Sequence, residues 1–331
     1  MLLAVVEDLA RGSGVEILTT WDARLAPPAW PANVEVRVAA TPEQEMAYAR
    51  ELAASADATW IIAPETGGLL RDRVRELAPV GGGRLNCSPT AIELCSDKLR
   101  LAAWLRERGI PTPATFLWTE TLDAAAEGVR IDEALIPWPV VVKPRDGAGS
   151  QATFLVQGVS TGQGPAADRG LSWSDLLSEL ADAPWPGDLI VQPFFAGRAV
   201  SVAAIVRTTD DFDLLPVGDQ RLSQDGRLAY QGGRLPAPDL IDGPTHALVA
   251  AVIQAMPGLS GWVGFDLLLP GDSDAAPVLI EINPRLTTSY IGYRRVASDN
   301  LAHRVVRSGK MLEPLRFSGQ VSFSAAGDVF A

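Results

Sequence analysis

Gly264-Phe265-Asp266 is followed, fifteen residues later, by Glu281-Ile282-Asn283-Pro284-Arg285, and these two segments are the most informative in the sequence. Side chains alternate along a strand, so Glu281 and Asn283 share one face, and a neighbouring strand can bring Asp266 alongside them. Two carboxylates and an amide oxygen are ligands suited to a Mg²⁺ ion that bridges nucleotide phosphates. The alternative is a structural ion pair with Arg285, because an unpaired buried charge is costly.

A second informative segment lies upstream, where the apolar run Pro139-Val140-Val141-Val142 leads into Lys143 and then into Asp146-Gly147-Ala148-Gly149-Ser150. Glycine has no Cβ, so the backbone N–H groups of such a loop can approach phosphate oxygens closely, and Lys143 adds a positive charge. The lysine precedes the glycines, which excludes a Walker motif. Taken alone, such a segment is more often an ordinary hairpin than a phosphate-binding loop.

Composition describes an ordinary globular chain of about two domains: 331 residues, of which 47% are hydrophobic and 21% charged. The net charge of −12 argues against nucleic acid and anionic membranes as main partners. The apolar start meets Glu7 and Asp8 at once, which is unlike a signal peptide, and no apolar run is long enough to span a bilayer. We therefore expect a cytoplasmic protein.

The two cysteines, Cys87 and Cys95, are expected to be buried thiols in a reducing compartment. With only His246 and His303 elsewhere, the chain lacks the usual ligand set of a structural zinc site. A lone histidine on a helix is more often structural than catalytic, so neither histidine is assigned a role.

The amino-terminal region alternates between helical and strand-like segments, which predicts a parallel α/β sheet. Helices are expected over residues 2–9, 42–55 and 69–77, and strands over residues 15–19, 34–39 and 58–63. Such sheets usually begin with a strand. We therefore expect that the first strand lies upstream and that Met1 is a truncated or wrongly assigned start.

Three domains are predicted, over residues 1–95, 96–188 and 189–331. A helix over 95–108 leads into the second, which is a small α+β unit with strands at 139–143 and 153–157 and a helix at 173–181. The third is rich in antiparallel strands, at 189–193, 199–207, 213–217, 263–269 and 278–282, with a helix at 244–256. Residues 224–238, rich in glycine and proline, are expected to form a long loop.

Together, these segments resemble the ATP-grasp superfamily of carboxylate–amine ligases from about residue 95 to about residue 300. The resemblance implies an ATP-grasp fold, α/β and α+β, with an amino-terminal parallel α/β (pre-ATP-grasp) domain. It assigns phosphate contacts to Lys98 and Lys143, a phosphate-covering loop to 146–150, and the adenine hinge to 192–195. The residues so assigned to the nucleotide are Lys98, Lys143, Asp146, Gly147, Gly149, Ser150, Gln192, Pro193, Phe194 and Phe195.

In the same resemblance, Asp266, Glu281 and Asn283 correspond to the metal ligands, and Arg285, with Lys143, to a catalytic residue. The implied cofactors are ATP and Mg²⁺ or Mn²⁺. The sequence departs from the family pattern at Ala199, where many of these ligases carry a glutamate that holds the ribose, and Gln192 stands where a glutamate usually opens the hinge.

Further segments resemble the tyramine–glutamate ligase branch of methanofuran biosynthesis, among them Gly218-Asp219-Gln220-Arg221 and Tyr230-Gln231-Gly232-Gly233. The resemblance implies that the γ-carboxylate of glutamate is activated as an acyl phosphate and joined to tyramine or a similar aromatic amine. Arginine matches a carboxylate bidentately and tyrosine can face an aromatic ring. Candidate substrate residues are Glu65, Arg221, Tyr230, Arg285, Tyr293 and Arg294.

Two alternatives remain at this point: another amino-acid or peptide ligase of the D-alanine–D-alanine type, and a non-catalytic nucleotide-binding module. The first uses the same phosphate machinery and would differ only in the acceptor pocket. Retention of the complete set of Lys98, Lys143, Asp266, Glu281 and Asn283 argues against the second, because a degenerate site has no physical need for it. The expected partners are small-molecule carboxylates and amines, with a homodimer as a possible assembly.

Overall fold

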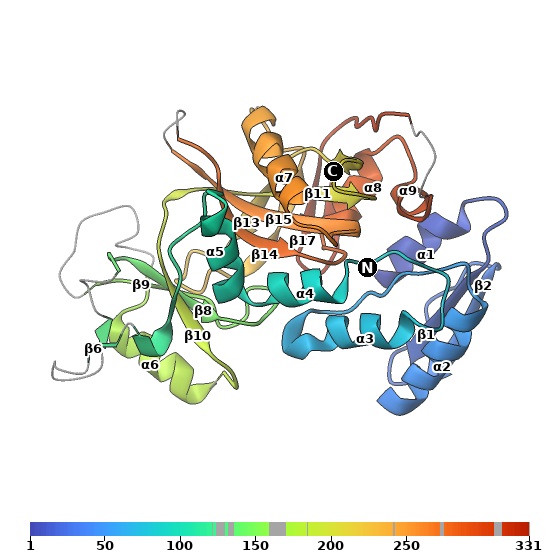
Figure 1. Ribbon diagram of the computed structural model, residues 1–331, viewed down its shortest axis with the longest axis horizontal. Helices are drawn as coiled ribbons and strands as arrows, with labels where there is room; N and C mark the ends of the chain where they lie inside the picture. The colour runs from blue at the N-terminus through green and yellow to red at the C-terminus, as the bar shows by residue number, and fades with distance from the viewer. Residues whose placement is uncertain are drawn as a thin grey trace.

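The computed structural model describes residues 1–120, 122–123, 130–131, 136–158, 170–183, 185–240, 242–271, 275–307 and 313–330. The amino-terminal part and the part built from the middle of the chain lie at opposite ends of the long axis, with the carboxy-terminal sheet between them (Figure 1). Within the described residues, no helix combines the length and the apolar character needed to cross a membrane. The predicted combination of an α/β part with antiparallel sheets is confirmed.

The amino-terminal part contains two separate pairs of parallel strands and their helices. Strand β1 (Ile17–Asp22) pairs with β2 (Val34–Ala39), and β3 (Ala58–Thr59) pairs with β4 (Gly83–Arg84). The helices are α1 (Leu2–Ala10), α2 (Pro42–Ser55), α3 (Leu69–Leu77) and α4 (Pro89–Ser96), with the short 3-10 helix η1 (Thr66–Gly68) before α3. Thr41 caps α2 by accepting a hydrogen bond from the Gln44 N–H, which explains why that helix begins where the sequence predicts.

The middle part is a four-stranded antiparallel sheet in the order β5-β10-β8-β9. Its strands are β5 (Phe116–Leu117), β8 (Val140–Pro144), β9 (Phe154–Val156) and β10 (Leu189–Pro193); η2 (Trp118–Glu120), β6 (Leu122–Asp123) and β7 (Arg130–Ile131) lie nearby in the chain. Helix α6 (Trp173–Asp182) packs its apolar side on this sheet, with Leu176 fully buried. The helix begins with a capping box between Ser172 and Asp175.

Helix α5 (Lys98–Glu107) connects the amino-terminal part to the middle sheet. The sequence predicted one continuous helix over 95–108, whereas α4 ends at Ser96 and α5 begins at Lys98. Asp97 breaks the run, because its carboxylate accepts a hydrogen bond from the Arg100 N–H and so caps a new helix. The break places Lys98 at the start of α5.

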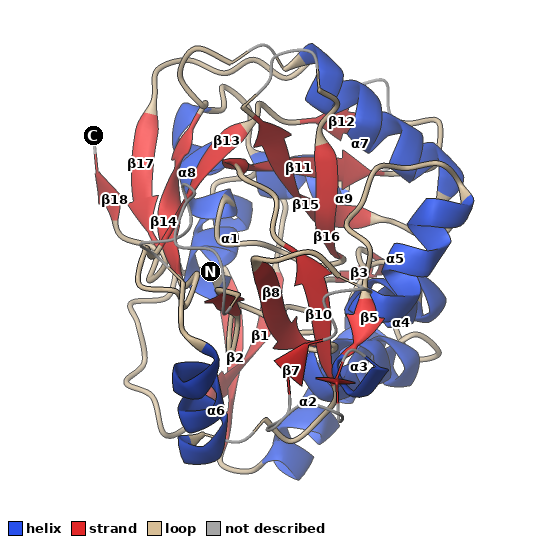
Figure 2. Ribbon diagram, turned by 90° about the vertical axis from the view of Figure 1, so that its left-hand side faces the viewer, coloured by secondary structure: helices blue, strands red, loops and turns tan. Residues whose placement is uncertain are grey.

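The carboxy-terminal sheet has eight strands, in the order β16-β15-β11-β13-β14-β17-β18 with β12 paired to β11. These are β11 (Gly197–Val206), β12 (Phe212–Leu214), β13 (Gly218–Leu222), β14 (Tyr230–Leu235), β15 (Gly261–Pro270), β16 (Val278–Asn283), β17 (Val321–Ser324) and β18 (Val329–Phe330). Helices α7 (Gly243–Ala255), α8 (Tyr290–Val296) and α9 (Leu301–Val306) accompany the sheet. Figure 2 shows β8 and β10 of the middle sheet below β15 and β16.

The predicted long loop over 224–238 is wrong, because β14 lies inside it and pairs with both β13 and β17. Glycine usually weakens a strand, yet here it permits a close backbone approach. A Cβ at Gly232, whose φ is +121°, would lie 2.0 Å from the Phe323 carbonyl oxygen. The residue that made this segment look like a loop is therefore the one that allows it to join the sheet.

The buried apolar residues form three clusters, one of which joins α3, α4 and α5 to the carboxy-terminal sheet. Cys87 and Cys95 lie in that cluster as free thiols, which confirms the prediction that both are buried.

Candidate functional site

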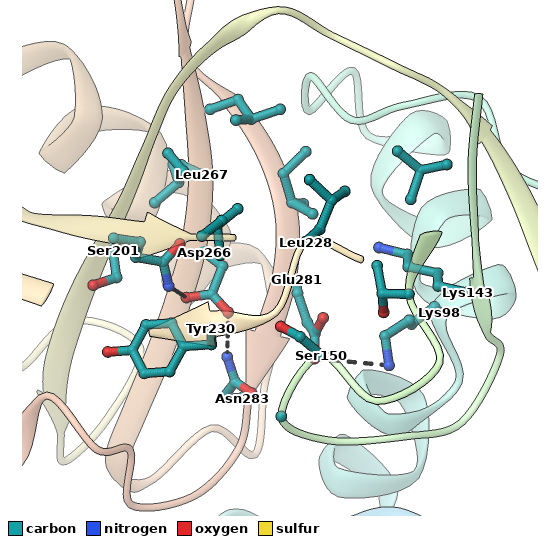
Figure 3. A pocket seen from close by; sticks show the side chains of 18 of the residues that line it. Lys98, Lys143, Ser150, Ser201, Leu228, Tyr230, Asp266, Leu267, Glu281 and Asn283 are labelled. Atoms are coloured by element: carbon teal, nitrogen blue, oxygen red, sulfur yellow. Dashed lines mark hydrogen bonds and ion pairs between the residues drawn. The ribbon is translucent and has the colours of Figure 1, made fainter. Parts of the chain in front are cut away.

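A cavity of about 470 Å³ lies where the middle sheet meets the carboxy-terminal sheet. Most of the residues assigned from sequence line it, although they come from six different elements and three loops. Those lining it are Lys98, Lys143, Gly147, Gly149, Ser150, Gln192, Pro193, Phe194, Phe195, Tyr230, Asp266, Glu281, Asn283 and Arg285. In Figure 3, Lys98 and Lys143 lie on one side, Asp266 and Asn283 on the other, and Glu281 between them.

Strand register brings the three candidate metal ligands together. Asp266 on β15 lies directly opposite Glu281 on β16, and Gly264 lies opposite Asn283. The Asn283 amide donates a hydrogen bond of 2.9 Å to Asp266 Oδ2. Burial, together with the neighbouring Glu281 carboxylate, raises the pKa of Asp266 to about 6. A cation at this point would relieve that repulsion.

The other carboxylate oxygen of Asp266 is held by a residue that the sequence analysis did not select. The Gln220 amide on β13 donates a hydrogen bond of 2.8 Å to Asp266 Oδ1. Ser201 on β11 lies opposite Asp266 across the β11–β15 pairing and also lines the cavity. Alternation along β11 and β13 could have pointed to both residues, but only once the sheet order was known.

The donor set fits a Mg²⁺ or Mn²⁺ ion that shares its coordination with phosphate oxygens. Among the described residues, no group of three or more His, Cys, Asp and Glu side chains could hold a metal by itself. Asp266, Glu281 and Asn283 offer two carboxylates and one amide oxygen, which are hard ligands. The set is incomplete without further oxygens, and this is the usual condition of a metal that arrives with a nucleotide.

Both lysines are buried, with 7% of Lys98 and 6% of Lys143 exposed. Burial lowers the pKa of Lys143 to about 8; the Glu281 and Asp266 carboxylates act in the opposite direction, and the charge of Lys98 lowers it further. Lys98 Nζ lies 3.7 Å from Glu281 Oε1. Two ammonium groups therefore face the two carboxylates across the cavity.

The glycine loop is held at two points by other parts of the chain. Lys98 Nζ donates a hydrogen bond of 2.7 Å to the Gly147 carbonyl. Asp146, which was assigned to the nucleotide, instead accepts a 2.8 Å hydrogen bond from the Gly67 N–H in η1 and does not line the cavity. The assignment of Asp146 to the nucleotide is therefore corrected, and the physical reason is that a carboxylate would repel phosphate. Gly149 and Ser150 have φ values of +73° and +58°.

The hinge residues lie at the edge of the cavity, but some of their polar groups already have partners. The Gln192 amide donates a 2.8 Å hydrogen bond to the Thr115 hydroxyl. The Phe194 N–H donates to the Pro139 carbonyl at 2.9 Å, so Phe194 can offer an adenine edge only its carbonyl. Phe195 is 40% exposed. Ala199, the departure noted in the sequence, also lines the cavity.

Arg285 is positioned by Glu65, a residue of the amino-terminal part. Its guanidinium donates to both carboxylate oxygens of Glu65, at 3.1 Å from Nη2 to Oε1, and Nη2 also donates to Asn283 Oδ1 at 3.3 Å. Glu65 is only 3% exposed and does not line the cavity. The expectation that Glu65 contacts substrate is therefore replaced by a role in orienting Arg285.

Of the candidate substrate residues Arg221 and Tyr230, only Tyr230 lines the cavity, because side chains alternate between the two faces of the sheet along a strand. Gln220 and Leu222 face the cavity, whereas Arg221 between them points away and donates to the Phe323 carbonyl at 3.3 Å. Tyr230 lines the cavity, and burial raises the pKa of its hydroxyl. Tyr230 thus stays a substrate candidate, and Arg221 is corrected to the opposite face of the sheet.

The last two candidates, Tyr293 and Arg294 of α8, are engaged in structural contacts outside the cavity. Tyr293 is fully buried, and its hydroxyl donates to the Pro216 carbonyl at 2.6 Å. Arg294 forms a bidentate pair with Asp8 of α1, at 2.9 and 2.6 Å. Both were assigned to substrate from sequence, and the structure corrects this because each side chain anchors α8 to a neighbour.

The two histidines also make structural contacts. His246 lies 3.0 Å from the Leu215 carbonyl and His303 lies 3.1 Å from the Leu9 carbonyl. Neither lines the cavity, in agreement with the reading from sequence.

Comparison with known proteins places this geometry in a family. Two family models match the chain, the ATP-grasp domain over residues 95–289 and the pre ATP-grasp 3 domain over residues 15–92. No curated protein sequence matches it.

Several solved structures share the fold at low sequence identity. A biotin carboxylase-beta-gamma-ATP complex from Campylobacter jejuni is 16% identical with a TM-score of 0.71, covering 97% of this chain and 72% of that one. An L-amino acid ligase from Bacillus licheniformis is 18% identical with a TM-score of 0.65, covering 92% and 70%. An N5-carboxyaminoimidazole ribonucleotide synthetase from Thermotoga maritima is 17% identical with a TM-score of 0.65, covering 97% and 76%. These likenesses concern the fold alone, but the ATP-grasp model spans more than half of the sequence, and the chain therefore belongs to the ATP-grasp family.

Proposed function

We propose that the protein is an ATP-dependent ligase that activates a carboxylate as an acyl phosphate and joins it to an amine, releasing ADP and phosphate. The observation that carries the proposal is the arrangement in one cavity of two buried lysines opposite two carboxylates and an amide, with Arg285 beside them. Phosphoryl transfer depends mainly on positioning and charge neutralisation, and this set supplies both.

Each residue is assigned a part in that reaction. Lys98 and Lys143 hold the triphosphate and stabilise the charge that develops on the transferred phosphoryl group. Asp266, Glu281 and Asn283 would hold Mg²⁺ or Mn²⁺, which supplies further charge neutralisation at the phosphates. Arg285, fixed by Glu65, has one Nη1 N–H without a partner among these contacts, and this N–H is assigned to an oxygen of the substrate carboxylate and to the oxyanion that forms when the amine attacks.

The domain division that we propose follows the same roles. Residues 1–95 support Arg285 through Glu65, residues 96–188 cover the nucleotide with the glycine loop, and residues 189–331 carry the metal ligands. Closure of the middle domain would exclude water, which protects an acyl phosphate from hydrolysis.

For the substrates, we propose glutamate, activated through its γ-carboxylate, and tyramine or a similar aromatic amine, as in methanofuran-type cofactor biosynthesis. Tyr230 supports this choice, since its ring lines the cavity and can face an aromatic amine. Other amino-acid ligases and a non-catalytic nucleotide-binding module are the alternatives.

The test is ATP consumption with Mg²⁺ or Mn²⁺ across a panel of carboxylates and amines, with glutamate plus tyramine first, separating ADP from AMP and identifying the amide by mass. ADP with γ-glutamyltyramine supports the whole proposal. ADP with another pair keeps the ligase and removes the substrates, whereas AMP contradicts the acyl-phosphate route. Nucleotide binding without turnover of any pair favours the non-catalytic alternative.

Matched variants make this test specific to the site. Glu281→Gln and Lys143→Met should each abolish most turnover and keep the fold, because each removes a charge aimed at the phosphates. Arg221→Met, which changes a charged residue on the far side of the same sheet, should keep turnover.

A further inference from the structure

The outer edge of strand β2 in the amino-terminal part is open. Within the described residues, β2 pairs only with β1, and Figure 1 shows it near one end of the long axis of the molecule. Its six residues, Val34–Ala39, alternate valines with charged residues and end in alanine. Val38 is 53% exposed, which is unusual for a valine in a strand. An open edge strand of this kind is a template for pairing with another chain.

Backbone alternation shows which groups of β2 point to the open edge. The Asn33 and Ala39 carbonyls accept hydrogen bonds from the β1 side, at 3.0 and 2.9 Å. In a parallel ladder, successive residues direct their backbone groups to opposite edges, so the odd-numbered residues of β2 face β1. The N–H and C=O groups of Val36 and Val38 therefore point to the open edge, where they can join a further strand.

The side chains of β2 form two sets on opposite faces of the strand. Val34, Val36 and Val38 share one face, and Glu35 and Arg37 share the other. Arg37 Nη2 lies 2.7 Å from Glu35 Oε1, and both side chains are about half exposed. Within the described chain, this is the only ion pair that either residue makes. Each charge is therefore able to take a partner on a second strand.

We propose that this edge is the contact surface for a second copy of the chain, whose β2 runs antiparallel to the first about a two-fold axis at Val36. The N–H of Val36 donates to the carbonyl of the partner's Val36, and the reverse bond follows by symmetry. In each chain the N–H of Val38 donates to the carbonyl of the partner's Val34. The two pairs of strands then form one continuous sheet in the order β1-β2-β2-β1.

The charges favour this register over its neighbours. With the axis at Val36, Glu35 lies opposite the partner's Arg37, and Arg37 lies opposite the partner's Glu35. These are non-hydrogen-bonded pairs, in which the Cα atoms are only about 4.5 Å apart and the side chains are close. An axis at Glu35 or at Arg37 would instead place two like charges opposite each other, which destabilises a strand pair. The surface is therefore complementary to itself, as a two-fold interface requires.

Helix α2 adds a second layer to this contact. Thr20 of β1, which is the register partner of Arg37, lies 3.4 Å from Glu45 of α2, so α2 covers the charged face of the strands. The helix contacts both β1 and β2. Because adjacent strands are about 4.8 Å apart, the axis places the two α2 helices about 10 Å from each other, close to the spacing of packed helices. A helix pair therefore enlarges an interface that would be small with the strands alone.

The first experiment traps the contact with single cysteines in the full chain under mild oxidation. Val36→Cys places two thiols at a symmetric pair whose Cα atoms are about 5.5 Å apart, within the range of a disulfide. Val38→Cys is the matched control, because its two copies lie about 14 Å apart in the same dimer. The native thiols of Cys87 and Cys95 are buried and do not compete.

The expected result is a covalent dimer from Val36→Cys and little from Val38→Cys. Random collision gives the opposite order, because Val38 is exposed and Val36 is partly buried. Equal or faster cross-linking of Val38→Cys would therefore overturn the proposal.

The second experiment measures the dissociation constant by sedimentation velocity over a range of protein concentrations. Glu35→Arg and Arg37→Glu should each raise it by about tenfold or more, because symmetry creates two like-charge pairs at once. The double variant Glu35→Arg/Arg37→Glu should restore it. All three should keep the unfolding temperature of the wild type, since both side chains are half exposed.

Two outcomes contradict the proposal: a chain that is monomeric at every concentration, and a dimer whose dissociation constant is the same in both single variants. The measurements use no nucleotide or substrate, so their outcome is independent of the proposed ligase activity.

Discussion

The pH dependence of nucleotide binding should follow the protonation of Lys143. Burial lowers the pKa of this lysine to about 8, although the Glu281 and Asp266 carboxylates act in the opposite direction. Only the protonated ammonium attracts phosphate. A group with a pKa of about 8 is about 90% protonated at pH 7 and about 10% at pH 9. We therefore expect the affinity for ADP to fall about tenfold over this range, which corresponds to about 1.4 kcal/mol.

The sign of this effect is set by the direction of the shift. Because the pKa is lowered, binding is strong below about pH 8 and is lost as the pH rises through that value, whereas an unperturbed lysine would stay charged until about pH 10. Cys87 does not titrate in the same window, since burial raises its pKa to about 12.

Isothermal titration calorimetry with ADP from pH 7 to pH 9, in buffer without divalent cations, measures this slope. Lys143→Met should bind ADP weakly and with little further change across the range, which also corrects for ionisation of the nucleotide. Lys98→Met should move the inflection of Lys143 to higher pH, because the charge of Lys98 is one of the causes that lower the pKa. A slope unchanged in Lys143→Met, or a wild-type affinity independent of pH, refutes the reasoning.

There are three further predictions, two for residues next to the site, Gln220 and Glu65, and one for Asp8, which contacts Arg294 far from the site. Gln220→Leu removes the amide that holds Asp266 Oδ1, so it should weaken Mn²⁺ binding in the presence of ADP by about 10- to 100-fold and leave the affinity for metal-free ADP unchanged. Mn²⁺ titration followed by electron paramagnetic resonance measures this, and a Mn²⁺ affinity equal to that of the wild type contradicts it. Glu65→Ala should cost about 3–5 kcal/mol of stability in urea unfolding and should also lower kcat, because Arg285 loses its buried partner. Asp8→Ala should also lower the stability in urea unfolding, by up to about 3–5 kcal/mol, because Arg294, whose side chain is 8% exposed, loses its bidentate partner and is left with Glu7 at 3.1 Å. The variant should keep kcat at a temperature where it is folded; a loss of kcat there would mean that the α1–α8 contact reaches the site.

Much of the local structure could be predicted from patterns along the chain. The period of apolar residues placed α2 and α3 at their observed bounds, and the strand of residues 34–39 was found entirely. The grouping of the three candidate metal ligands could also be predicted, because Glu281 and Asn283 are two apart on one strand and Asp266 belongs to the adjacent strand. The grouping of these three residues requires only that side chains alternate along a strand and that the two strands pair.

What could not be predicted depends on contacts between distant segments. Arg221 and Gln220 are adjacent, and which of them faces the cavity depends on the register of β13 in the sheet. Arg294 was assigned to substrate because arginine suits a carboxylate, but the carboxylate that it meets is Asp8, nearly three hundred residues away in the sequence. Likewise, the glycines of β14 suggested a loop until the close approach of β17 was known.

The contact between Lys98 and the Gly147 carbonyl has a consequence for how a nucleotide enters. The ammonium has three N–H donors; one is given to this neutral acceptor at 2.7 Å, and the Glu281 carboxylate lies 3.7 Å away. Under the proposed function, a phosphate bound by Lys98 would therefore share its ammonium with the backbone of the glycine loop. One side chain would then tie the position of the loop to the occupancy of the phosphate site.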